Sequence, residues 1–310
     1  MIAPKLKIGD EIRVISPSRS LSVVKEARIK EAVEFLESQG FKVTFSKNCR
    51  KIDEVDSSSI QERVDDLHEA FLDQNIKAIL TSIGGFNVNQ ILEYINYDII
   101  KNNPKIICGY SDITALLNAI YAKTGLITYH GLHFSSFKNH LNREYSNMFF
   151  KKCVCESEQY DIYPSSQEYN YEIIQKGKVE GEIVGGNLCT LNLLQGTEFM
   201  PDLEGKILFI EDDNIVWDLF SYEFDRNLQS LLQVKGADKI KGIVFGKFSE
   251  DSKMTKEVIK RIVENKRQLK NVPIVFNIDF GHIFPMITFP IGGKIRIELD
   301  NRSIITILNG

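Results

Sequence analysis

Short apolar runs alternate with amphipathic stretches over the first 130 residues of the chain. The runs are rich in Val and Ile, and the stretches between them repeat apolar side chains at the spacing of a helix with one buried face. This alternation is typical of βα units and predicts a doubly wound parallel sheet. We expect strands at residues 11–15, 41–45, 78–83 and 106–109, and helices at residues 23–39, 59–71, 88–94 and 112–123.

The C-terminal half has a different pattern, richer in strands. Residues 156–178 contain few aliphatic side chains and are expected to link an N-terminal α/β domain (1–155) to a C-terminal β-rich domain (179–310). The second domain is expected to contain strands at residues 206–210, 240–245, 272–276 and 294–308, and a helix at residues 222–234.

The length of the chain agrees with two domains, and its charge indicates which class of partner to expect. A chain of 310 residues is about twice the commonest domain size. Charged residues make up 26% and the net charge is −4, which argues against a dedicated nucleic-acid or membrane-surface binder. The expected partner is therefore a small molecule or peptide.

Targeting and redox signals are sparse. The first residues have no apolar core of signal-peptide length, and no segment approaches the roughly 18 apolar residues that span a bilayer, so we expect a cytoplasmic location. The five cysteines form no Cys-x-x-Cys pair, and their number is odd. They are interpreted as reduced thiols rather than a disulfide framework or a zinc site.

Ser111 lies between an expected strand and an expected helix. Open parallel sheets bind ligands at this edge, and the free N–H groups of the helix favour a developing negative charge. Ser111 is therefore a candidate nucleophile, although the sequence lacks the second glycine of the hydrolase motif Gly-x-Ser-x-Gly. The alternative is that Ser111 or Asp112 is only the N-cap of the following helix.

Gly84 and Gly85 follow the expected third strand. Without side chains, their backbone N–H groups can approach a ligand oxygen and supply half of an oxyanion hole. An ordinary tight turn is the alternative. A dinucleotide site is not expected, because the segment does not complete Gly-x-Gly-x-x-Gly.

A serine nucleophile needs a base, and histidine titrates in the right range. His68 lies in an amphipathic helix and His140 in a polar segment, so both are expected at the surface. His130 and His133 flank a possible fifth strand that approaches the same sheet edge. His282 follows a buried strand and precedes a turn-rich segment suited to a fixed loop, which makes it the favoured base, with His130 as the alternative.

An acid that holds the imidazole in the required tautomer is expected nearby. Glu211 ends the apolar run at 206–210, and Asp212 and Asp213 follow it directly. Composition alone does not separate the three. A metal site is the other interpretation of such a cluster, but no His-x-x-x-His or carboxylate loop of defined spacing accompanies it, so no metal or cofactor is expected.

An ordered series of short segments runs through the chain: Gly84-Gly85, Gly109-Tyr110-Ser111-Asp112, His130-Gly131, Gly185-Gly186-Asn187-Leu188, Glu211-Asp212, Asp225-Arg226 and Gly281-His282. This series resembles the LD-carboxypeptidase family of serine peptidases, which includes the microcin C self-immunity peptidases. The resemblance spans nearly the whole chain.

The resemblance implies a catalytic triad of Ser111, His282 and Glu211, with the backbone N–H groups of Gly85 and Asp112 as the oxyanion hole. It also implies a flavodoxin-like N-terminal sheet, a β-rich C-terminal domain, an active site in the groove between them, and a homodimer. No cofactor is implied.

Within this family, one branch removes the terminal D-alanine from cell-wall tetrapeptides, and the immunity branch cleaves the amide between an aminoacyl group and a nucleotide-like moiety. Residues 128–131, 194–201 and 224–231 look more like the immunity branch. A peptide-binding protein that has lost turnover is a further alternative.

Three residues are expected to contact the substrate: Gly84, Asn187 and Trp217. The segment 214–222 is apolar and contains the only tryptophan of the chain, whereas the tetrapeptide branch is expected to have a shorter segment rich in Glu and Pro. Trp217 is a candidate for stacking on a nucleobase. Filling a core or a dimer interface is the alternative.

Overall fold

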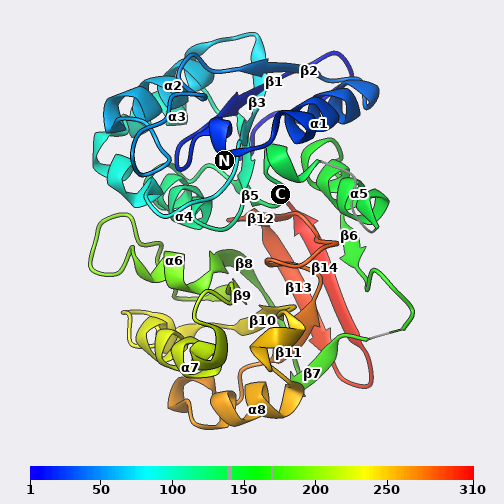
Figure 1. Cartoon of the computed structure of the whole chain (residues 1–310). Coiled ribbons are helices and arrows are strands. Elements are labelled where there is room, and N and C mark those ends of the chain that lie inside the picture. The colour runs from blue at the N-terminus through cyan, green and yellow to red at the C-terminus, as the bar shows by residue number, and fades with distance from the viewer. Residues whose placement is uncertain (138–141, 169) are drawn as a thin grey trace.

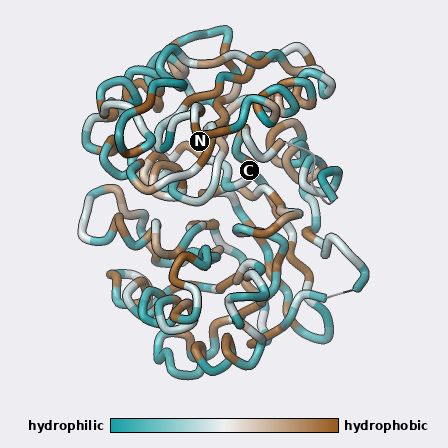
Figure 2. Tube along the Cα trace, viewed as in Figure 1, coloured by the Kyte–Doolittle hydropathy of each residue, from teal (hydrophilic) through white to brown (hydrophobic). Residues whose placement is uncertain are grey.

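Two β-sheets, one centred in each half of the chain, organise the molecule (Figure 1). The computed structural model describes residues 1–137, 142–168 and 170–310. The two domains lie one above the other in Figure 1, and both chain termini lie near the boundary between them. Brown, apolar segments follow the strands in the interior, and teal segments lie mostly outside (Figure 2).

The first sheet has six strands in the order β12-β5-β4-β3-β1-β2. Its first five strands in the chain are parallel, and their order is that of flavodoxin-like folds, which confirms the predicted doubly wound sheet. These strands are β1 (Glu11–Ile15), β2 (Lys42–Phe45), β3 (Ile76–Thr81), β4 (Ile106–Gly109) and β5 (Thr128–His130). The helices around them are α1 (Glu26–Ser38), α2 (Ile60–Leu72), α3 (Tyr97–Asn102), α4 (Ile113–Thr124) and α5 (Arg143–Val154).

Two helix predictions need adjustment. The segment 88–94 is a 3-10 helix, η2 (Val88–Tyr94), rather than an α-helix. Its first N–H groups donate to the Asp112 carboxylate, which fixes the chain where it enters this tight turn. Helix α1 starts at Glu26 because a 3-10 turn, η1 (Leu21–Val23), precedes it. Helix α2 begins with a capping box formed by Ser59 and Glu62.

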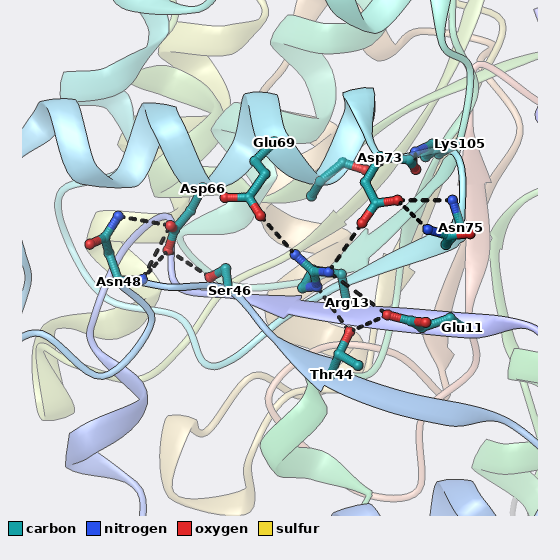
Figure 3. Close-up of polar contacts among 11 residues, drawn as sticks. Glu11, Arg13, Thr44, Ser46, Asn48, Asp66, Glu69, Asp73, Asn75 and Lys105 are labelled. Atoms are coloured by element: carbon teal, nitrogen blue, oxygen red, sulfur yellow. Dashed lines mark hydrogen bonds and ion pairs between the residues drawn. The ribbon is translucent and has the colours of Figure 1, made fainter.

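Arg13 joins strand β1 of the first sheet to helix α2 (Figure 3). Its Nε atom donates to Thr44 Oγ1 of β2 at 2.9 Å. Its two terminal nitrogens pair with Glu69 (3.5 Å) and Asp73 (3.4 Å) at the end of α2. Because Arg13 is buried and these contacts come from a strand and a helix, they set the position of α2 on the sheet.

The second sheet has eight strands in the order β6-β14-β13-β8-β9-β10-β11-β7. Strands β8 to β11 are parallel, and the strands added on either side of them are antiparallel. The central strands are β8 (Gly177–Asn187), β9 (Lys206–Glu211), β10 (Gly242–Gly246) and β11 (Ile274–Ile278). The outer strands are β6 (Tyr160–Ile162), β7 (Glu172–Gln175), β13 (Lys294–Leu299) and β14 (Ser303–Asn309), and the helices are α6 (Leu188–Asn192), α7 (Phe220–Leu231) and α8 (Lys256–Glu264).

The segment predicted as a linker contains two of these strands. β6 and β7 lie at opposite edges of the second sheet, where each pairs with a single neighbour. Edge strands bury only part of their side chains, which explains why the segment has few aliphatic residues and lacks a strand signal.

The C-terminal half also returns to the first sheet. Strand β12 (Phe289–Ile291) pairs antiparallel with β5, so the separation predicted at residue 179 does not hold for this strand. No helix among the described residues is both long enough and apolar enough to cross a membrane.

Candidate active site

Ser111 occupies the turn between β4 and α4 in a left-handed backbone conformation, with φ of 60°. This conformation costs a residue with a Cβ roughly 1–2 kcal/mol and is typical of functional turns. It is the conformation of a nucleophile elbow, which presents the serine hydroxyl at the edge of the sheet. The elbow forms with Ile113 in place of the second glycine of the hydrolase motif.

Asp112 does not cap helix α4 with its side chain. Its Oδ2 atom accepts hydrogen bonds from Ser18 Oγ (2.5 Å) and from the backbone N–H groups of Asn87 (3.0 Å) and Val88 (2.9 Å). Burial raises the pKa of this carboxyl, and the hydrogen bonds from these donors oppose the rise. Asp112 therefore ties the loop after β3 to the turn that carries Ser111.

Gly84 lies directly against the nucleophile. A Cβ atom at this position would lie 2.9 Å from Ser111 Cβ and 3.0 Å from Ser111 Oγ, so only glycine fits without displacing the serine. Next to it, the N–H of Gly85 and the N–H of Asp112 have no hydrogen-bond acceptor among the described residues. Two free donors thus belong to the two segments that meet at Ser111.

His282 connects Ser111 to Glu211. Its Nε2 atom lies 3.0 Å from Ser111 Oγ, and its Nδ1 atom lies 2.8 Å from Glu211 Oε2. Glu211 is the last residue of β9 and is fully buried. Gly281, with φ of 117°, allows the close approach, because a Cβ there would lie 3.0 Å from Glu211 Oε2.

Opposing effects set the charge of His282. Burial lowers the pKa of the imidazole, but the Glu211 carboxylate raises it by charge and by hydrogen bonding, and Asp213 and Asp212 add to this effect. The net result is a pKa of about 9. The pKa of Asp212 is itself raised well above its ordinary value by burial and then by the charges of Glu211 and Asp213.

The loop that carries His282 bridges the two sheets. It leaves β11 in the second sheet and enters β12 in the first. Asp279 fixes the start of this loop by accepting hydrogen bonds from Ser165 N (2.9 Å), Ser165 Oγ (3.0 Å) and Tyr145 Oη (3.3 Å). The fold thus holds the imidazole from both domains.

Helix α4 also contacts the second sheet directly. Asn118 exchanges two hydrogen bonds with the backbone of Gly185, at 2.8 and 3.2 Å, and Thr114 Oγ1 accepts the Asn187 N–H at 3.0 Å. Asn187 and Glu211 are paired neighbours at the carboxyl ends of β8 and β9. The strand ends of both sheets therefore meet at the same place.

A cavity of about 460 Å³ opens beside the serine, within the range of small-ligand sites. It contains two of the three residues expected to contact substrate, Gly84 and Asn187, whereas Trp217 does not line it. The described residues that line it are Arg19, Ile83, Gly84, Gly85, Phe86, Tyr110, Ser111, Asp112, His133, Asn187, Cys189, Thr190, Leu193, Asp213, Ile215 and His282.

The Asn187 side chain is held by hydrogen bonds, whereas the Trp217 side chain is largely exposed to solvent. The Asn187 amide donates to Asp212 (3.1 Å) and Asp213 (3.3 Å), and its oxygen caps α6. Trp217 is 71% exposed, two residues beyond Ile215 at the cavity wall. The base-stacking role of Trp217 stays a prediction from the sequence.

The other described histidines do not contact Ser111 through hydrogen bonds. His130 is fully buried on β5 and stacks on Phe289 at 4.6 Å, and burial together with the His282 charge lowers its pKa to about 3. His133 Nδ1 lies 2.8 Å from Thr81 Oγ1. His68 is half-buried on α2 and accepts the Asn96 N–H, so it is less exposed than predicted; His140 lies outside the described residues.

Sequence reasoning missed Arg19 and Asp279. Arg19 follows the strand-ending segment Ser16-Pro17-Ser18, at the same carboxyl edge of the sheet as Ser111, and this placement is a usable signal. Asp279 has no comparable signal, because its partners are more than 100 residues away in the chain. Among the described residues, no group of three or more His, Cys, Asp or Glu side chains is arranged to hold a metal ion.

Comparisons with known proteins identify the family. The chain matches the LD-carboxypeptidase N-terminal domain over residues 12–131 and the LD-carboxypeptidase C-terminal domain over residues 180–297. It is 46% identical to the putative carboxypeptidase YocD of Bacillus subtilis, over 96% of each chain. The crystal structure of an MccF-like protein from Bacillus anthracis superposes with a TM-score of 0.96, at 46% identity and 100% coverage of both chains.

A third relative has a named role. The microcin C7 self-immunity protein MccF of Escherichia coli is 35% identical over 98% of this chain and 96% of its own. The structure of MccF in complex with aspartyl sulfamoyl adenosine has a TM-score of 0.87 to this chain, at 32% identity and covering 100% of this chain and 99% of that one. The fold and site define a serine-type carboxypeptidase. The chain belongs to the LD-carboxypeptidase family.

Proposed function

We propose that Ser111, His282 and Glu211 are the nucleophile, general base and orienting acid of an amide hydrolase. The observation that carries this proposal is the continuous contact from Ser111 Oγ through both imidazole nitrogens to Glu211. With the Nδ1 proton donated to Glu211, the Nε2 lone pair faces the serine hydroxyl.

Each step of hydrolysis then has a group to perform it. Ser111 Oγ attacks the carbonyl carbon of the amide, and His282 Nε2 accepts the hydroxyl proton. The C–N bond breaks as His282 returns that proton to the leaving nitrogen. Water next attacks the ester carbon and gives a proton to His282, the bond to Ser111 Oγ breaks, and the serine recovers its proton.

The free N–H groups of Gly85 and Asp112 are proposed to bind the oxyanion of both tetrahedral intermediates. Each such donor typically contributes about 3 kcal/mol to transition-state stabilisation. The Asp112 side chain supports this role indirectly, because its hydrogen bonds to Asn87 and Val88 hold the loop that carries Gly85.

For the substrate, we propose an amide that joins an aminoacyl group to a nucleotide-like moiety, near the carboxyl end of a small conjugate. The similarity to MccF over nearly the whole chain and the aspartyl sulfamoyl adenosine bound by that protein support this choice. Gly84 and Asn187 are the proposed substrate contacts within the cavity.

The test compares kcat/KM for aspartyl sulfamoyl adenosine with kcat/KM for a peptide ending in L-Lys-D-Ala. The proposal expects the nucleotide conjugate to be cleaved with the higher value. A preference for the peptide would assign the chain to cell-wall tetrapeptides instead. Saturable binding of both compounds without any product would contradict the proposed catalysis.

We also propose a homodimer that uses the segment after Glu211. Trp217, Leu219 and Tyr222 lie close together in the chain and are 71%, 63% and 73% exposed, which supports an interface that would cover them. Sedimentation velocity should show a dimer for the wild type and a monomer for Leu219→Asp. A wild-type chain that stays monomeric at all concentrations would contradict this assembly.

A further inference from the structure

Arg19 is an unpaired cation at the wall of the catalytic cavity. Among the described residues, its side chain makes no hydrogen bond or ion pair, and its Nε atom is shielded from solvent without an acceptor. It is also the only lysine or arginine among the described residues that line the cavity. A partly desolvated guanidinium without a partner is suited to bind an anion.

The side chain of Arg19 lies beside the proposed oxyanion donor. A Cβ atom on Gly85 would lie 2.8 Å from Arg19 Cγ and 3.1 Å from Arg19 N. Arg19 therefore borders the space in which the carbonyl oxygen of a substrate would bind, in the same cavity as Ser111.

The wall that the C-terminal domain contributes has the opposite charge. Asp213 lines the cavity there, directly after Glu211 and Asp212. An acid group of a substrate would be repelled by the Asp213 carboxylate, so it should bind on another wall of the cavity, near a cation. Arg19 supplies that cation from the N-terminal domain.

We propose that Arg19 binds the acid group of the leaving fragment, next to the scissile nitrogen. In a peptide this group is the terminal carboxylate, and in an aminoacyl nucleotide it is the acidic sulfur or phosphorus group that bears the nitrogen. The planar guanidinium can bind either group through two parallel hydrogen bonds. The inference rests on the proposed amide hydrolase and adds that the acid end of the substrate lies against the N-terminal domain.

The experiment measures binding by titration calorimetry in the Ser111→Ala background, so that no turnover is required. The probes are the peptide ending in L-Lys-D-Ala with a free carboxylate, the same peptide with a terminal amide, and aspartyl sulfamoyl adenosine. Each is titrated into Ser111→Ala alone and combined with Arg19→Gln, Arg19→Lys or the control Arg28→Gln. Arg28 is exposed on α1 and does not line the cavity.

Arg19→Gln should raise the Kd of a probe whose acid group binds Arg19 by about 10- to 100-fold. The Kd of the peptide with a terminal amide should change by less than about threefold. The peptide acid and the sulfamoyl conjugate report separately which source of the acid group is used. Arg19→Lys should fall between, because a point charge lacks the planar fork, and Arg28→Gln should match the background.

Two results would overturn the inference, provided that thermal unfolding shows the variants to be folded. One is that Arg19→Gln weakens binding of the peptide acid and the peptide amide equally. The other is that it weakens binding of neither the peptide acid nor the sulfamoyl conjugate. The outcome is separable from the proposed function. If the wild type hydrolyses neither probe but charged-probe binding still depends on Arg19, the hydrolase proposal fails and the anion site stands.

Discussion

His282 Nε2 lies 3.0 Å from Ser111 Oγ, although the two residues are 171 positions apart in the chain. Ser111 follows β4 of the first sheet, and His282 lies on the loop that runs from β11 of the second sheet into β12 of the first. Because β12 pairs with β5, which is the neighbour of β4, the base is anchored in the sheet that carries the nucleophile. The contact therefore depends on the way the chain crosses between domains.

Replacing Glu211 with Gln tests the orienting acid. The amide keeps the size of the side chain but removes the charge that favours the Nδ1–H tautomer and the imidazolium, so kcat should fall by about 10³- to 10⁴-fold. Steady-state kinetics on the preferred substrate provides the measurement, with Glu298→Gln at a distant strand as the control. A loss below tenfold would mean that Glu211 does not act through His282.

The pH dependence follows from the raised pKa of His282. Catalysis needs the neutral imidazole, so kcat/KM should rise with pH and level off above about 9. Asp213→Asn removes a charge that raises this pKa, so the inflection should move to lower pH, whereas Asp218→Asn at an exposed site should leave it in place. An unchanged inflection near 6.5 in the wild type would contradict the charge assignment.

The same pKa shift has a consequence for stability. The pKa of His282 in the folded chain lies above its ordinary value of 6.5. The ion pair with Glu211 therefore stabilises the fold fully below that value, and this contribution is lost as pH rises through about 9. The free energy of unfolding of the wild type should therefore fall between pH 6.5 and about 9 relative to that of His282→Gln, and the two pH dependences should be parallel below 6.5. Chemical denaturation at a series of pH values provides the measurement.

Gly84→Ala should disable the nucleophile while all three triad side chains are kept. The new Cβ would meet Ser111 Cβ at 2.9 Å and Ser111 Oγ at 3.0 Å, and displacing the reacting atom by a fraction of an ångström should lower kcat by about 100-fold. Gly242→Ala, whose nearest contact would be Val179 Cγ2 at 3.3 Å, serves as the control on β10. Equal activity of the two variants would show that Ser111 is not confined by Gly84.

Asp279→Asn should loosen the base rather than remove it. The substitution weakens the hydrogen bonds from Ser165 and Tyr145 that fix the start of the His282 loop. We expect a lower kcat with little change in KM, together with about 1–3 kcal/mol less stability. Asp300→Asn, at an exposed turn, is the control, and an unchanged kcat in a destabilised Asp279→Asn would leave the residue a purely structural role.

The sequence predicts the parallel sheet and the location of Ser111 because both depend on local patterns. Strand runs, helix periodicity and the strand-to-helix position of Ser111 can be identified within a few neighbouring residues. The sequence does not predict the left-handed conformation of Ser111, because the second glycine that is typical of a nucleophile elbow is absent.

The crossing of the chain between sheets is not predictable in the same way. Strand β12 has three residues, one of them Pro290, and its partner β5 is about 160 positions earlier, so no periodic signal marks it. The sequence also fails to predict the edge strand β7, because its half-exposed residues resemble those of a linker. Periodicity does not predict that Glu211 and His282 lie near Ser111. The family resemblance does.

The most direct test of the account is peptide mapping by mass spectrometry after the folded protein reacts with a fluorophosphonate, a reagent that modifies activated serine hydroxyls. The account predicts one adduct, on Ser111, that is absent from Ser111→Ala and is formed much more slowly by His282→Gln. An adduct on another serine, or amide hydrolysis by Ser111→Ala at the wild-type rate, would contradict the claim that Ser111 is the nucleophile.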